Sequence, residues 1–183
     1  MVKPKLLIVG DSFSSDNTAD SWTAQLEYNI TNISSCGSSE YRILQKLETA
    51  DLEQYEKVLV VHTSANRIYV EHNPLHQHDT QYQQCDLIYN DVKNSSQQDT
   101  YTKSVVWWFE NCWDQNQANY IHSLLINRAK ELTMEKGVHI TFFDYTLPAV
   151  ANLHAHWKNH PGKINHMDIA GNKNVAQILK KYL

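Results

Sequence analysis

The chain has 183 residues, which is enough for one α/β domain with a full core and too few for two. Its hydrophobic fraction of 42% and charged fraction of 20% are typical of globular proteins, and a formal charge of −4 gives no reason to expect nucleic acid as a partner. No apolar run approaches the roughly 20 residues that span a bilayer, so we expect neither a membrane partner nor a signal peptide.

The first third of the chain alternates short apolar runs with helical patterns. Three buried strands are predicted, at residues 5–9, 29–34 and 57–62. Between them we expect one helix that starts at Asp20 or Ser21 and carries Trp22 inward, and a second that is capped by Ser38 or Ser39. This spacing implies parallel strands joined by right-handed crossovers, which places the ends of all three strands at one edge of a sheet.

The rest of the chain is less regular until its last third. Residues 70–116 are rich in His, Gln, Asn and Tyr, and we interpret them as a long insertion at the same sheet edge that ends in a short helix. An amphipathic helix is predicted over 118–136 with Gly137 after its end, then a strand over 138–145. A loop follows over 146–162, and Asp168 is predicted to cap a final helix.

Polar residues follow each of the three predicted strands. Ser12 comes after Gly10-Asp11 at the end of the first strand, Gly37 follows the second and Asn66 the third. A serine hydroxyl needs a base to become a nucleophile, and acyl transfer needs hydrogen-bond donors for the developing oxyanion. His166, just before the final helix, is the natural base.

These residues, in this order, resemble the SGNH hydrolases, also called the GDSL esterase/lipase family. The likeness is carried by residues 10–14, Gly37, residues 64–66 and residues 165–172, and it covers nearly the whole chain except 70–116. Together with the strand pattern, this resemblance implies a single domain over 1–183. We expect a three-layer α/β/α sandwich around a parallel sheet of four or five strands, with a flavodoxin-like layout.

The resemblance also implies roles for the site residues. Ser12 would be the nucleophile and His166 the general base. The N–H groups of Ser12 and Gly37, with the side chain of Asn66, would form the oxyanion hole. Asp11 would mainly hold the turn.

Three positions depart from the family pattern. Ser64 stands where Gly is usual, and Arg67 stands where Asp is common. Lys163 occupies the usual place of the acidic third member of the triad. Three explanations stay open: a Ser–His dyad oriented by a backbone carbonyl, a carboxylate supplied by Asp144, or a site that has lost catalysis. Arg67 and Asp11 are candidate substrate-binding residues, with a surface salt bridge as the alternative role of Arg67.

The function predicted from these observations is hydrolysis of a carboxylic ester through an acyl-serine intermediate. The polar insertion favours short acyl groups, such as acetyl, on a polar or carbohydrate alcohol, and thioester or peptide hydrolysis would use the same site. The alternative is an inactive module of the same fold that binds a glycan or a protein.

No cofactor is predicted, and no metal either. His72, His76, His78 and Asp79 show no fixed ligand spacing. Three cysteines without a CxxC pair predict reduced thiols in a cytoplasmic protein, and the oligomeric state stays open.

Overall fold

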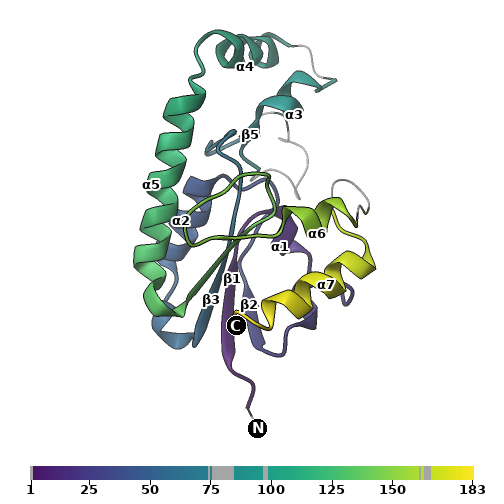
Figure 1. The fold of residues 1–183 in the computed structure, drawn as a ribbon. Coiled ribbons are helices and arrows are strands. Elements are labelled where there is room, and N and C mark those ends of the chain that lie inside the picture. The colour runs from purple at the N-terminus through teal and green to yellow at the C-terminus, as the bar shows by residue number, and fades with distance from the viewer. Residues whose placement is uncertain (1, 74, 76–84, 97–98, 161, 163–165) are drawn as a thin grey trace.

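A computed structural model of the chain shows one parallel sheet with helices on both of its sides (Figure 1). The structure describes residues 2–73, 75, 85–96, 99–160, 162 and 166–183. The sheet has five strands in the order β2-β1-β3-β6-β7, and every neighbouring pair is parallel. Its strands are β1 (Lys5–Val9), β2 (Asn29–Asn32), β3 (Lys57–His62), β6 (Gly137–Thr141) and β7 (Ala151–Asn152). The predicted three-layer α/β/α fold is confirmed, and its fifth strand is only two residues long.

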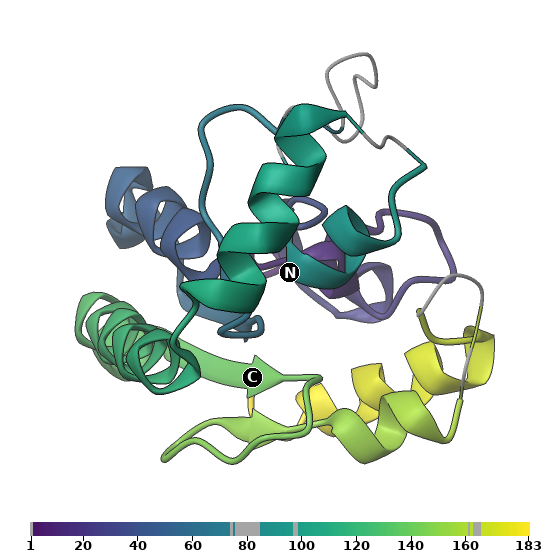
Figure 2. The same ribbon diagram turned by 90° about the horizontal axis from the view of Figure 1, so that it is seen from above.

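The helices form two layers and a cap, which Figure 2 shows from above. One layer holds α2 (Glu40–Thr49) and α5 (Gln115–Thr133), and the other holds α1 (Ser12–Ser15), α6 (His154–Lys158) and α7 (Ile169–Leu179). Beyond the carboxyl ends of the strands lie α3 (Tyr89–Lys93), α4 (Thr100–Asn111) and the antiparallel pair β4 (Arg67–Ile68) and β5 (Leu87–Ile88). Short 3-10 helices occur at Thr23–Gln25, Leu52–Gln54 and Met134–Lys136.

Successive side chains of each strand point to opposite faces of the sheet, so the core has two halves, one on each face. Leu6 and Ile8 of β1 face the layer of α7, whereas Leu7 and Val9 face the layer of α2. All four side chains are at most 1% exposed, which explains why β1 is apolar at successive positions.

Two predicted helix starts are confirmed by their caps. The Ser39 hydroxyl accepts the Arg42 N–H at 3.3 Å at the start of α2. The Asp168 carboxylate accepts the Gly171 N–H at 2.7 Å at the start of α7.

Several predicted boundaries were wrong. The helix expected from Asp20 or Ser21 is only the 3-10 helix Thr23–Gln25. The α-helix ends at Thr133 and continues as the 3-10 helix Met134–Lys136, so Gly137 follows the helical segment as predicted and also begins β6. Strand β6 ends at Thr141 instead of 145. The predicted loop 146–162 contains β7 and α6. The insertion 70–116 ends in a short helix as predicted, α4, but it also contains β5 and α3.

The strand order determines where a ligand can reach this fold. The chain crosses from β1 to β2 on one side and then returns to β3 on the other side of β1. Open α/β sheets bind ligands at such a switch point, beyond the carboxyl ends of the strands. Here that point lies between the residues after β1 and those after β3. None of the helices in the described residues has the length and apolar character needed to cross a bilayer.

Candidate active site

Ser12 lies in the tight turn that follows β1. Gly10 leaves no room for a side chain, because a Cβ added there would lie 2.6 Å from Val61 Cβ. Asp11 caps α1, its carboxylate accepting the Phe13 N–H at 3.0 Å, and Ser12 is the first residue of that helix. Ser12 is half-buried, and its hydroxyl has no hydrogen-bond partner among the residues that the structure describes.

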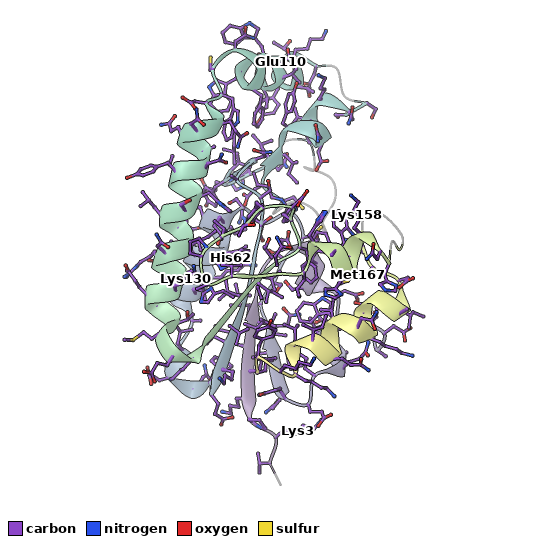
Figure 3. All side chains as sticks on the ribbon, viewed as in Figure 1. Lys3, His62, Glu110, Lys130, Lys158 and Met167 are labelled. Carbon is purple, nitrogen blue, oxygen red and sulfur yellow. The ribbon has the colours of Figure 1, made fainter. Side chains whose placement is uncertain are left out.

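His166 comes to this turn from the other end of the chain. Its ring stacks on the ring of Phe13, with centroids 5.4 Å apart and planes inclined by 29°. Phe13 in turn packs against Phe142 of the core, so the stacking surface is fixed. The His166 ring therefore lies beside the residue that follows Ser12, and its neighbour Met167 marks this side of the molecule in Figure 3.

Asp11 and Arg67 form a buried ion pair behind Ser12. The Arg67 Nη2 lies 3.1 Å from the Asp11 Oδ2, and these side chains are 9% and 0% exposed. The Thr63 hydroxyl donates to the same carboxylate oxygen at 3.0 Å. Burial raises the pKa of Asp11, while Arg67 and the Phe13 N–H act in the opposite direction. The salt bridge considered for Arg67 does form, but it is buried, and it joins the turn after β1 to the start of β4.

Gly37 has the left-handed backbone conformation that favours glycine. Its φ is +67°, and a Cβ there would lie 2.7 Å from the Cys85 Sγ. Its carbonyl accepts the Asp86 N–H at 3.0 Å. The carbonyl of the next residue, Ser38, accepts a hydrogen bond from Arg67 Nη1 at 3.2 Å, which ties this turn to the Asp11 pair.

Asn66 lies at the same sheet edge but faces the cap. The residue is exposed, and it lines a hollow of about 220 Å³ together with Tyr89, Asn90 and Gln115. Its backbone N–H donates to the Ser64 hydroxyl at 3.2 Å, so Ser64 stabilises this turn where a glycine is usual in the family. In the described part of the chain, Arg67 rather than Asn66 contacts Asp11 of the Ser12 turn and the Ser38 carbonyl.

The other candidate residues are placed as follows. Asp144 is exposed, three residues beyond the end of β6, and makes no ion pair within the described residues. Lys163 lies outside the described residues, as do His76, His78 and Asp79, whereas His72 is described and exposed. Across the described residues, no group of three or more His, Cys, Asp or Glu side chains is placed to hold a metal ion.

The sequence analysis missed a buried cluster behind this edge, formed by Glu40, His62, His122 and His139. The Glu40 Oε1 lies 2.8 Å from His62 Nδ1, whose Nε2 lies 2.8 Å from His139 Nδ1. The Glu40 Oε2 accepts the Thr63 N–H at 3.1 Å and lies 3.5 Å from His122 Nε2. Figure 3 shows His62 in the interior of the molecule.

The charges of this cluster are set by burial and by the mutual contacts of its members. Burial opposes ionisation of Glu40, but the His62 and His122 rings outweigh it and lower the pKa of Glu40 to about 2. Burial, with His62 nearby, lowers the pKa of His139 to about 3. The signal in the sequence was His62 at the end of an otherwise apolar strand, where a polar side chain needs a buried partner.

Comparisons with known proteins add one finding. No protein-family model matches the chain, and no curated protein matches it. Among solved structures, the chain is similar to one titled "Crystal Structure of TesA", with 13% sequence identity and a TM-score of 0.49. The match covers 97% of this chain and 96% of that one. The function proposed below therefore rests on the site itself.

Proposed function

We propose that the chain is a serine ester hydrolase of the SGNH class, with Ser12 as nucleophile and His166 as general base. The observation that carries the proposal is the stacking of His166 on Phe13 at 5.4 Å. It brings a histidine from the last fifth of the chain to Phe13, the residue that follows Ser12, and the Ser12 hydroxyl has no hydrogen-bond partner in the described residues. A serine and a histidine that meet at the switch point of a parallel sheet support a nucleophile and base for acyl transfer.

The proposed reaction has two halves. The Ser12 Oγ attacks the ester carbonyl while its proton passes to His166, and the oxyanion is stabilised by the N–H groups of Ser12 and Gly37 and the Asn66 side chain. Collapse releases the alcohol, which takes the proton from His166 and leaves an acyl-serine. Water then attacks the acyl group by the same route, which releases the acid and restores Ser12. These steps use neither a metal nor a cofactor.

Two features orient the proposed base. Asp168, two residues after His166, caps α7 and so fixes the start of that helix. We propose that a backbone carbonyl or Asp144 accepts a hydrogen bond from the second ring nitrogen, in the role of the third triad member. The buried Asp11–Arg67 pair holds the turn that carries Ser12.

The surroundings of Asn66 support a polar substrate with a short acyl group. The hollow that it lines combines the amides of Asn90 and Gln115 with the rings of Tyr89 and Trp113. Amides and aromatic faces together suit a sugar or another polyol, whose hydroxyls need hydrogen bonds and whose ring carbons pack on aromatic surfaces. We therefore propose an acetyl ester of a polar or carbohydrate alcohol, in a cytoplasmic setting.

The test is hydrolysis of p-nitrophenyl acetate, together with labelling by a fluorophosphonate probe. We expect Ser12→Ala to abolish labelling and both Ser12→Ala and His166→Ala to reduce turnover by at least about 100-fold. Ser15→Ala, on the same helix, and His156→Ala, on α6, are the matched controls and should keep wild-type rates. Asp144→Asn distinguishes a triad from a dyad.

Full turnover by Ser12→Ala would overturn the site assignment. Absence of both turnover and labelling in the wild-type protein would overturn the hydrolase and favour the alternative, an inactive module that binds a glycan or a protein. Direct binding measurements with acetylated and free oligosaccharides would then replace the kinetic assay.

A further inference from the structure

Besides the hollow next to Asn66, the described residues form a second cavity at the turn after β3. Neither Ser12 nor His166 lines it. It has a volume of about 290 Å³ and lies between the start of α2, the residues after β3 and the α4–α5 corner. Most of its wall is apolar or aromatic, formed by Tyr41, Ile68, Tyr69, Trp108, Trp113 and Ile121. Its volume is near the lower end of the range of small-molecule sites, about 300 Å³ and upward.

The aromatic wall is built from two pairs of rings. Tyr41 and Tyr69 meet edge to face with centroids 4.9 Å apart, and Trp108 and Trp113 do so at 5.8 Å. Such rings offer flat, rigid surfaces that suit another aromatic ring. Arg67 also lines the cavity, but its guanidinium is already paired with Asp11.

Two of the polar side chains that line the cavity, His122 and Glu40, are buried. His122 is 6% exposed, and its Nε2 lies 2.8 Å from the Thr63 carbonyl oxygen. A carbonyl oxygen can only accept, so Nε2 carries a hydrogen, and in the tautomer protonated at Nε2 the acceptor is Nδ1. The Tyr145 hydroxyl donates to the same carbonyl oxygen, and Glu40 Oε2 lies 3.5 Å from Nε2, so the ring is fixed in this orientation.

The Nδ1 atom of His122 has no hydrogen-bond partner among the described residues. It is not fully enclosed either, since Thr102 Oγ1 is the one fully buried side-chain polar atom left without a partner in the described part of the chain. His122 lines the cavity, so this acceptor is reached from the cavity. A largely apolar cavity with a fixed, unpartnered acceptor in its wall favours ligands that carry a donor.

We propose that this cavity binds a small aromatic molecule with a single hydroxyl or N–H donor, which donates to Nδ1 of His122. The rings of the cavity wall hold the aromatic body, and the lone pair of His122 sets its orientation. The site is separate from the Ser12 chemistry and does not depend on it, so Ser12→Ala keeps this binding.

The first test compares two probes of nearly equal shape, phenol and toluene, by titration calorimetry on the full chain. We expect phenol to bind about tenfold more tightly than toluene, because only phenol can donate a hydrogen bond to Nδ1 of His122. With 15N-labelled histidine, the Nδ1 resonance of His122 should shift with phenol and stay unchanged with toluene. Equal affinities, or a silent Nδ1 resonance, would overturn the proposal.

Variants locate the site. His122→Leu should bring the ratio of phenol to toluene affinity to about one. Ala118→Trp, which fills the cavity from α5, should abolish binding of both probes. Asn127→Trp, an exposed position on the same helix, is the matched control and should bind as the wild type does. Phenol binding that survives Ala118→Trp would place the ligand elsewhere and refute the assignment.

Discussion

Thr63, the residue directly after β3, uses its backbone and side-chain polar groups to join two clusters. Its N–H donates to Glu40 and its hydroxyl donates to Asp11. Its carbonyl accepts hydrogen bonds from His122 and Tyr145. The residue is fully buried, so none of these bonds can be replaced by water. Thr63 therefore connects the Ser12 turn with the Glu40 cluster.

Thr63→Val should destabilise the protein by about 1–3 kcal/mol, because it keeps the shape of the side chain and removes one donor from the buried Asp11 carboxylate. Thr63→Ser should retain most of the stability. Thr49→Val, at an exposed position of α2, is the control and should change the free energy of unfolding by less than about 0.5 kcal/mol. Urea denaturation measures all three, and equal effects at positions 49 and 63 would contradict this account.

At the scale of elements, the cap over the sheet edge is tied to α2 by one buried ion pair. The Asp86 carboxylate, just before β5, is 2.8 Å from Arg42 Nη2 and 3.1 Å from Arg42 Nε. It also accepts the N–H groups of Ser39 at 2.6 Å and Val70 at 3.1 Å. Four donors on one buried carboxylate hold β5, the chain after β4 and the start of α2 together.

Asp86→Ala should therefore cost about 3–5 kcal/mol of unfolding free energy, because it leaves a partly buried guanidinium and two N–H groups without their acceptor. In a double-mutant cycle with Arg42→Ala, we expect a coupling energy above about 1 kcal/mol. The exposed pair Arg128 and Glu131 is the matched control, with coupling between about 0 and 1 kcal/mol. Additive effects of the Asp86 and Arg42 variants would show that the pair does not hold the cap.

Elements could be predicted from sequence where local signals agreed with tertiary packing. Strand β3 was predicted at its exact limits, because its branched apolar residues are buried on both faces. The helix expected near Ser21 is absent because Trp22 is held by groups outside it: its N–H donates to Asn172, 150 residues away, and its indole N–H donates to the Phe13 carbonyl. Such contacts override local helix propensity, and nothing in the local pattern reveals them.

The candidate site could be predicted where its residues follow strands and could not be predicted where they meet only through packing. Ser12 and Gly37 follow strands, so topology alone brings them to one edge. Glu40 looked like an ordinary acidic residue in a first helical turn, and only the packing of α5 against α2 shows that it faces His62 and His122. Buried polar partners far apart in the chain leave no periodic signal.

At the scale of the whole molecule, the Glu40 cluster couples folding to pH. The pKa of Glu40 falls from an ordinary value of 4.5 to about 2 on folding, and that of His139 falls from 6.5 to about 3. Both folded values are depressed, so both contributions are complete above the unfolded pKa and are lost as pH falls toward the folded pKa. Stability should therefore decline from about pH 6.5 downward, and more steeply below pH 4.5.

Glu40→Gln tests this coupling. At pH 7 we expect it to lower the free energy of unfolding by about 3 kcal/mol, the order of magnitude that the pKa shift implies. The difference from wild type should shrink between pH 4.5 and pH 2, because the wild-type carboxylate becomes protonated there. Glu48→Gln, an exposed position on the same helix, should follow the wild-type profile. Thermal unfolding measured from pH 2.5 to 7 gives the stability of each variant as a function of pH. Parallel stability curves for the wild type and Glu40→Gln would refute the coupling.

The edges of the sheet have a consequence for behaviour at high concentration. One edge is β7, with two residues, and the other is β2, whose four residues alternate between exposed and half-buried and include two asparagines. Long, flat, apolar edges act as templates on which a second molecule can add a strand and begin to aggregate. Here both edges are too short or too polar to do so, which protects a wide parallel sheet from edge-to-edge polymerisation.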